Sequence, residues 1–177
     1  MTEEVSWEYF NSIPWCSKLI NNTDYILTPE LSLTDGPDTE DSLFAETLNT
    51  GNNIRSTLSL FKKPTHDLQI NEVRRLISLG DGINGKANIL HGGIAATLMD
   101  EAMGMLMLLS TLSLASRTTV TAGLNVSYKR FIETPQIILV VAKLRETAYG
   151  YVSRRNYDWI QCTAAHFLLT LKLKGWS

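Results

Sequence analysis

A histidine, two glycines and an aspartate stand close together near the middle of the sequence: His91, Gly92, Gly93 and Asp100. Paired glycines at the start of a helix leave its first backbone N–H groups open to approach. These groups lack partners within the helix and lie at its positive end, so they can polarise a carbonyl and stabilise an oxyanion. The alternative for the glycines is that they only permit a tight strand-to-helix turn. For His91 two roles stay open: it can donate a hydrogen bond near a carbonyl, or it can pack against or cap the turn.

Asp100 follows Gly93 by seven residues, which is about two turns of an α-helix, and the surrounding run is apolar. A carboxylate in apolar surroundings costs free energy unless it has a partner or a function. Asp100 is therefore predicted to be a catalytic carboxylate. The alternative is a structural role, as a salt bridge or a hydrogen-bonded strut, with Arg117 or Lys129 as possible partners. Glu101 points about 100° away on the same helix and is predicted to be structural.

The elements that position these residues are one helix and several strands. The helix is predicted to run from His91 to about Leu109 and, being apolar on nearly every face, to be buried. Residues 119–130 alternate between apolar and polar side chains, which is typical of a strand, and Thr121 lies on the polar side, where a hydroxyl can steady a carboxylate. Further strands are predicted at 54–61, 72–79, 137–144, 150–157 and 161–173. The predicted class is α+β, with an antiparallel sheet of five to six strands wrapped around the helix.

The first part of the chain is predicted to differ from the rest. Residues 1–20 have a helical pattern that Pro14 should break. Residues 21–53 are rich in Asn, Thr, Asp, Ser, Gly and Pro, and they predict a long loop with one helical turn around 41–48. Such a loop is compatible with a lid over a site or with a plain surface wrap.

Composition and charge exclude several classes of function. The chain has 177 residues, which suits a compact domain, and its formal net charge of −2 provides no basic surface for nucleic acid. Cys16 and Cys162 have no metal-ligand spacing and are expected to be free thiols in a reducing, cytoplasmic environment. The longest apolar run, 94–109, is shorter than the ~20 residues of a membrane span and contains two carboxylates. No metal or phosphate-loop signature is present in the sequence.

Two segments resemble the hot-dog-fold acyl-CoA thioesterases. They are His91-Gly-Gly-(six residues)-Asp100 and Thr121-Ala-Gly-Leu-Asn-Val-Ser-Tyr-Lys-Arg130. The resemblance is to the phenylacetyl-CoA thioesterase type and, more closely, to the thioesterase-superfamily-member type. It covers roughly 53–173 and is strongest over 90–130. It implies a hot-dog domain over 53–177 behind an N-terminal extension over 1–52, and a homodimer, possibly extended to a tetramer, whose sites use both subunits.

The same resemblance implies roles for individual residues. Asp100 would be the general base or nucleophile, and the N–H of Gly93, or of its neighbour Gly92, would polarise the thioester carbonyl. Thr121 would position the carboxylate or its water. The glycine turn would come from one subunit and the aspartate from the other. No cofactor is implied beyond the coenzyme A of the substrate.

Substrate-binding residues are implied less directly. Lys129 and Arg130 match a basic pair near the coenzyme A channel of the family, so contact with its phosphates is expected. Many relatives carry an asparagine six residues before the histidine, where this chain has Gly85. Asn84 or Asn88 is then the candidate for contact with the carbonyl.

The expected activity is hydrolysis of an acyl-CoA, or of an acyl-carrier-protein thioester, to an acid and a thiol. Two alternatives stay open: a hydratase or dehydratase on the same fold, and an acyl-CoA-binding or interaction protein without turnover.

Overall fold

Residues 3–28, 41–64, 69–110, 121, 123–144 and 170–172 are described by the computed structural model. In chain order, its elements are α1 (Glu3–Asn11), α2 (Pro14–Ile20), β1 (Tyr25–Thr28), the π-helix η2 (Leu43–Leu48), β2 (Ile54–Lys62), β3 (Glu72–Leu79), β4 (Asn84–Lys86), β5 (Ile89–Leu90), α3 (Gly92–Ser110), β6 (Gln136–Lys143) and β7 (Thr170–Lys172).

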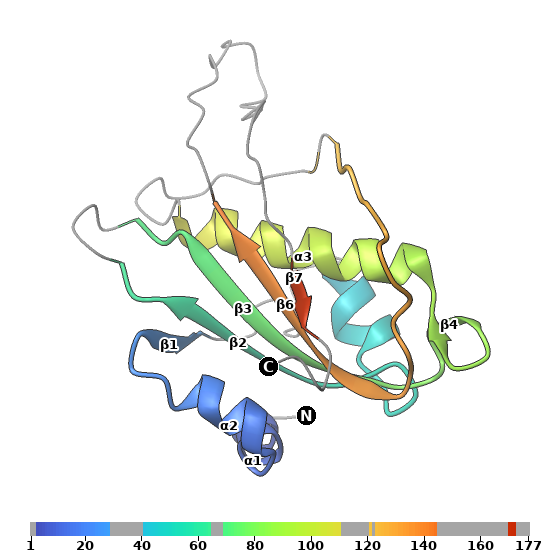
Figure 1. The fold of residues 1–177 in the computed structure, drawn as a ribbon, viewed down its shortest axis with the longest axis horizontal. Coiled ribbons are helices and arrows are strands. Elements are labelled where there is room, and N and C mark those ends of the chain that lie inside the picture. The colour runs from blue at the N-terminus through green and yellow to red at the C-terminus, as the bar shows by residue number, and fades with distance from the viewer. Residues whose placement is uncertain are drawn as a thin grey trace.

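A five-stranded sheet in the order β1-β2-β3-β6-β7 holds the molecule together, and each neighbouring pair is antiparallel. The long helix α3 lies across one face of this sheet (Figure 1). This arrangement is the hot-dog fold, as predicted. The central strands β3 and β6 are buried along nearly their whole length because both of their faces are covered.

The two faces of the sheet pack against different helices. Alternate residues of β3 and β6 face α3, and they join its buried side in the larger core: Val73, Ile77, Leu79, Ile138, Val140, Ala142, Ala95, Leu98, Ala102 and Leu106. The intervening residues meet α1 and α2 on the opposite face, in a smaller core: Leu76, Leu139, Val141, Leu58, Phe10, Cys16 and Ile20. Period-two alternation along the strands thus serves two separate cores.

The N-terminal segment is more ordered than its composition predicts. Pro14 is the first residue of α2 and separates it from α1, as expected of a residue that lacks an N–H. The helical turn predicted around 41–48 is present as η2. The prediction of a loop throughout 21–53 is wrong at β1, because Tyr25–Thr28 pairs with Ser59–Lys62 of β2.

The strand predicted over 119–130 is not formed by the residues described there. Residues 121 and 123–130 have no ladder partner in the described chain, and most of their side chains are exposed. A strand requires a neighbour for its backbone groups, and its alternating pattern does not supply one. The residues before His91 form a small hairpin of β4 and β5, with Asn88 at a φ of 58° between them. The predicted strand 150–157 and most of 161–173 lie outside the described residues.

Helix α3 is buried on one side only, which corrects the prediction of burial all round. Its buried residues face the sheet, whereas Gly92, Gly93, Gly104 and Leu108 are exposed. By length and composition alone this helix could cross a membrane. Its packing against β3 and β6 and the two carboxylates at its centre are instead the features of a core helix.

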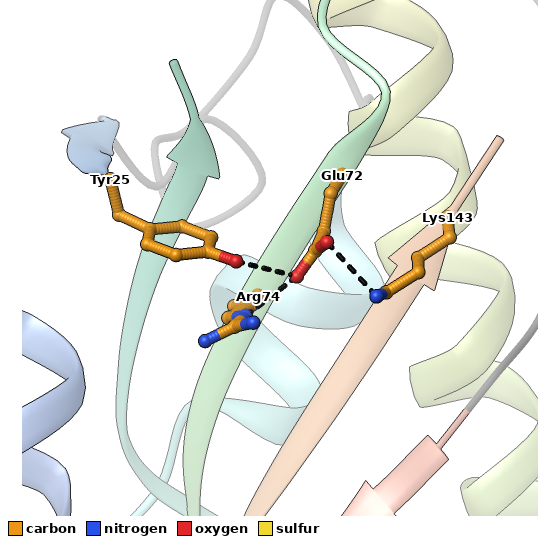
Figure 2. A network of polar contacts seen from close by, with 4 residues as sticks. All are labelled: Tyr25, Glu72, Arg74 and Lys143. Carbon is orange, nitrogen blue, oxygen red and sulfur yellow. Dashed lines mark hydrogen bonds and ion pairs between the residues drawn. The ribbon is translucent and has the colours of Figure 1, made fainter. Parts of the chain in front are cut away.

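A buried carboxylate joins three strands at one end of the sheet (Figure 2). Glu72 accepts hydrogen bonds from the Tyr25 hydroxyl at 2.8 Å and Arg74 Nε at 2.7 Å, and it pairs with Lys143 Nζ at 3.1 Å. The Arg74 guanidinium also lies over the Tyr25 ring, 4.1 Å from its centroid. We call these four residues the Glu72 cluster.

Candidate functional site

The helix start (His91–Gly93) is positioned by backbone hydrogen bonds to two loops. Leu90 N–H donates to Ile132 O at 2.9 Å, and His91 N–H donates to Ile83 O at 3.0 Å. These bonds hold the residues before α3 between the 80s loop and the segment that leads into β6. The first turn of α3 therefore begins at a fixed place beside residues 123–132.

His91 caps the helix with its own side chain. The Gly93 N–H donates to His91 Nδ1 at 2.9 Å, and the Ala95 N–H donates to the His91 carbonyl at 3.0 Å. The imidazole thus takes the place of the serine or aspartate that usually satisfies an early helix N–H. The sequence left two roles open for His91, donation near a carbonyl and capping of the turn, and the structure shows the capping hydrogen bond.

The two glycine amides are not equivalent. Gly93 N–H is engaged by His91, whereas Gly92 N–H is exposed and has no acceptor within the described part of the chain. The Gly92 carbonyl accepts a hydrogen bond from the Tyr128 hydroxyl at 2.9 Å. Sequence reasoning missed Tyr128, because the alternating pattern assigned it to the apolar side of a strand, and the pattern reports nothing about its hydroxyl.

Asp100 lies on α3 next to the segment that follows it in the sequence. Its side chain is half-buried, and Oδ1 accepts a hydrogen bond from the Thr121 hydroxyl at 2.8 Å. The structure therefore brings together two residues that the sequence analysis singled out separately. Within the described ranges Asp100 forms no ion pair, and Lys129 is therefore not its partner. The other predicted partner, Arg117, lies outside the described residues.

The neighbouring carboxylate has a different environment. Glu101 pairs with Arg75 of β3, with 3.4 Å between Oε1 and Nη1, and Arg75 is almost fully buried. Arg75 Nε also donates to the Ser59 hydroxyl at 3.1 Å. These contacts tie α3 to the sheet, which agrees with the structural role predicted for Glu101.

The two halves of the candidate site lie apart within one chain. Gly92 and Asp100 are eight residues apart on a continuous helix, which corresponds to about 12 Å along its axis. A carbonyl that accepts a hydrogen bond from Gly92 N–H is therefore beyond direct reach of the Asp100 carboxylate of the same chain.

The remaining predicted binding residues lie near the β4–β5 hairpin. Asn88 lines an open hollow of about 610 Å³ together with Phe131 and Glu133. Lys129 and Arg130 are exposed and immediately precede Phe131. Neither Asp100 nor Gly92 lines this hollow. The structure therefore does not bring Asn88, Lys129 and Arg130 into one cavity with the Asp100 carboxylate.

No group of three or more His, Cys, Asp or Glu side chains that could hold a metal ion occurs among the described residues. The groups that the described residues bring to the candidate site are a carboxylate, a hydroxyl, an imidazole and backbone amides.

Comparison with known proteins gives two findings. Residues 87–148 match the family model described as the thioesterase superfamily, and this range contains the predicted site residues from Asn88 to Arg130. The chain is also 27% identical, over 169 aligned residues, to a protein of Lecanicillium sp named verlamelin biosynthesis protein B. That alignment covers 77% of this chain and 73% of the relative.

Proposed function

We propose that this chain, which carries the thioesterase-superfamily match over residues 87–148, hydrolyses an acyl thioester to a carboxylic acid and a thiol. The observation that carries the proposal is the hydrogen bond from Thr121 to Asp100, on a helix whose first amide is open. Oδ1 accepts the hydrogen bond from the hydroxyl, and Oδ2, which has no hydrogen-bond partner among the described residues, is the oxygen proposed to accept a proton or to attack a carbonyl carbon.

The proposed reaction starts with the thioester carbonyl accepting a hydrogen bond from Gly92 N–H. Between the two glycines, Gly92 is the better candidate because Gly93 N–H already donates to His91. Asp100 takes a proton from water, and the resulting hydroxide attacks the carbonyl carbon. The C–S bond then breaks, and the thiolate leaves and is protonated. In the second route Asp100 attacks the carbonyl carbon, the C–S bond breaks with loss of the thiolate, and water then hydrolyses the resulting acyl anhydride to the acid and free Asp100.

The site is proposed to combine two copies of the chain. The separation of Gly92 and Asp100 along α3 supports this, because a single chain cannot present both groups to one carbonyl. The exposed segment 123–130, which has an alternating pattern and no strand partner in the described chain, is the proposed contact surface.

The substrate is proposed to be an acyl-CoA or an acyl-carrier-protein thioester. Two exposed cationic side chains, Lys129 and Arg130, have the charge that binds the phosphate groups of both carriers. The relative named for verlamelin biosynthesis supports a thioester of a biosynthetic route, and it also keeps a hydratase or dehydratase on the same fold as the rival function.

The test is to measure thiol release from acyl-CoAs of short, long and aromatic acyl groups, with enoyl absorbance followed in parallel. Wild-type protein should release thiol without changing enoyl absorbance. Asp100→Asn should lower kcat by about 10²–10⁴-fold, since it removes the proton acceptor, and should unfold at the same temperature. Asp81→Asn, the same change at an exposed turn, is the control. Undiminished thiol release by Asp100→Asn would rule out the proposal.

A further inference from the structure

Helix α3 has a glycine on its exposed side, about one turn beyond Asp100. Gly104 is exposed, and a β-carbon built on it would meet no atom of the described residues within 4 Å. Glycine in a helix interior is destabilising relative to alanine, because its backbone loses more conformational freedom on folding. The helix is therefore less stable for having Gly104, and no close contact within the described chain requires a residue without a side chain there.

A side chain at position 104 would lean toward the carboxylate. Residues four apart on a helix are neighbours on its surface, and helical side chains tilt toward the N-terminus. A side chain at 104 would therefore cover the turn that carries Asp100. Asp100 Oδ1 accepts the hydrogen bond from Thr121. The space that Gly104 leaves open thus lies beside the residue that is proposed to react.

The same row of the helix continues to an exposed apolar residue. Leu108 follows Gly104 by four residues, and it is 43% exposed. Asp100, Gly104 and Leu108 form one row along α3, with a rise of about 6 Å between successive members. A carboxylate, a gap and an apolar side chain in this order suit a substrate whose reactive carbonyl is attached to an apolar chain.

We infer that Gly104 determines which acyl groups this chain accepts, and that the acyl group passes over Gly104 toward Leu108. The inference rests on the proposed thioester hydrolysis and adds an acyl-binding surface to it. The acyl group is bonded to the carbonyl carbon that Asp100 or its water attacks, so it must begin beside the carboxylate. Gly104 leaves room for it there, and Leu108 offers it apolar contact. In the proposed two-chain site, the second copy covers the acyl group from the other side.

The first test measures kcat/KM for thiol release from straight-chain acyl-CoAs, from acetyl to palmitoyl. The ratio of kcat/KM for long to short acyl groups should fall about 10-fold in Gly104→Ala and on the order of 100-fold in Gly104→Leu, because a methylene in an apolar pocket changes kcat/KM by about 10–200-fold. The unfolding temperature of Gly104→Ala should rise by roughly 2–4 °C. Gly51→Ala, at a glycine outside α3 with equally open surroundings, is the control and should keep the wild-type ratio.

Leu108→Ala tests the direction of the acyl group. Leu108 lies about 12 Å beyond Asp100 along the helix axis, and Gly104 lies about 6 Å beyond it. The shortest acyl group for which Leu108→Ala lowers kcat/KM should therefore be longer than the shortest one for which Gly104→Ala does. The same threshold for both variants, or the reverse order, would contradict a path toward Leu108.

Sedimentation of the variants separates the acyl group from a second copy as the reason for the glycine. If Gly104→Ala lowered kcat/KM by one factor for every acyl length, or unfolded earlier and lost the pairing of the wild type, the glycine would serve chain contact and the inference would be overturned. An unchanged ratio in Gly104→Leu, in a protein that hydrolyses acyl-CoAs, overturns the inference alone. Wild-type protein that releases no thiol from any acyl-CoA refutes the proposed function, and the inference with it.

Discussion

Thr121 and Asp100 show how a single hydrogen bond can prepare a carboxylate for chemistry. The hydroxyl lies 2.8 Å from Oδ1 and comes from an exposed segment, so it contributes little packing. A hydrogen bond to a charged group is worth roughly 1.5–3 kcal/mol. Its loss should therefore be felt mainly in the orientation of the carboxylate.

We predict that Thr121→Ala lowers kcat by about 10-fold or more, because about 1.4 kcal/mol of lost stabilisation corresponds to a factor of ten. Thr121→Ser keeps the hydroxyl and should stay near the wild-type rate. The unfolding temperature of both variants should change little, as expected for an exposed residue. If the Ala and Ser variants turned over substrate equally fast, the hydroxyl would have no part in the reaction.

Glu72 is the residue whose protonation should matter most for stability. Burial raises the pKa of its carboxyl, but hydrogen bonds from Arg74, Tyr25 and Lys143 lower it by more, so the net pKa lies below the ordinary value of 4.5. Burial, followed by the bond to Glu72, raises the pKa of Tyr25 to about 12, which keeps its hydroxyl protonated as a donor. The Glu72 cluster is thus held in one charge state near neutral pH.

We predict that Glu72→Gln lowers the free energy of unfolding by roughly 2–3 kcal/mol, less than for a fully buried pair because Lys143 is partly exposed. A depressed folded-state pKa stabilises the fold at pH values above the unfolded value. The difference in free energy of unfolding between wild type and Glu72→Gln should thus have its full size above about pH 4.5 and should shrink as the pH falls below that value. Urea denaturation at several pH values measures this, and a difference that grew on acidification would contradict the assignment.

At the residue scale, the sequence singled out the candidate residues but not their contacts. Asp100 was recognisable because a carboxylate interrupts an apolar helix, and Thr121 because it stands on the polar side of an alternating run. The bond between Gly93 N–H and His91 Nδ1 could not be predicted, since it depends on the side-chain geometry of a turn. The Tyr128 contact with Gly92 depends likewise on how two segments cross.

At the scale of elements, strong patterns predicted well and short ones did not. The predicted strands 54–61, 72–79 and 137–144 and the helix to about Leu109 agree with β2, β3, β6 and α3 within two residues at each end. These elements are long and largely buried, so burial dictates their conformation. Strands β1, β4 and β5 have two to four residues each, too few to establish a period. The segment 119–130 has the period of a strand but no neighbour in the described chain.

The N-terminal helices cover a sheet face that would otherwise be open, as Figure 1 shows for α1 and α2. Phe10 is fully buried between α1 and the sheet, whereas Trp7 on the same helix is exposed. We predict that Phe10→Ala lowers the free energy of unfolding by about 3–5 kcal/mol, because it leaves a cavity in the smaller core. Trp7→Ala should cost much less. Equal effects of the two substitutions in urea denaturation would mean that α1 does not pack on the sheet as described.

At the scale of the whole molecule, each chain is proposed to contribute its Gly92 amide to one site and its Asp100 carboxylate to a second site. Gly92 and Asp100 are eight residues apart on α3, a rise of about 12 Å along its axis, so in the proposed reaction each residue acts with the complementary group of a second copy. The exposed side of α3 and the segment 123–130 are where that copy is proposed to sit. Activity should therefore depend on pairing, and the two halves of a site can be inactivated in different chains.

The most direct measurement is thiol release by a mixture of two inactive variants, Asp100→Asn and Gly92→Pro. Proline removes the Gly92 N–H at the first position of α3, where a helix tolerates it and no internal hydrogen bond is lost. A mixed dimer then keeps one intact site, so chains that pair at random should regain up to about a quarter of the wild-type rate. If the variants are co-expressed and mixed dimers form without any thiol release, the two-chain site is wrong.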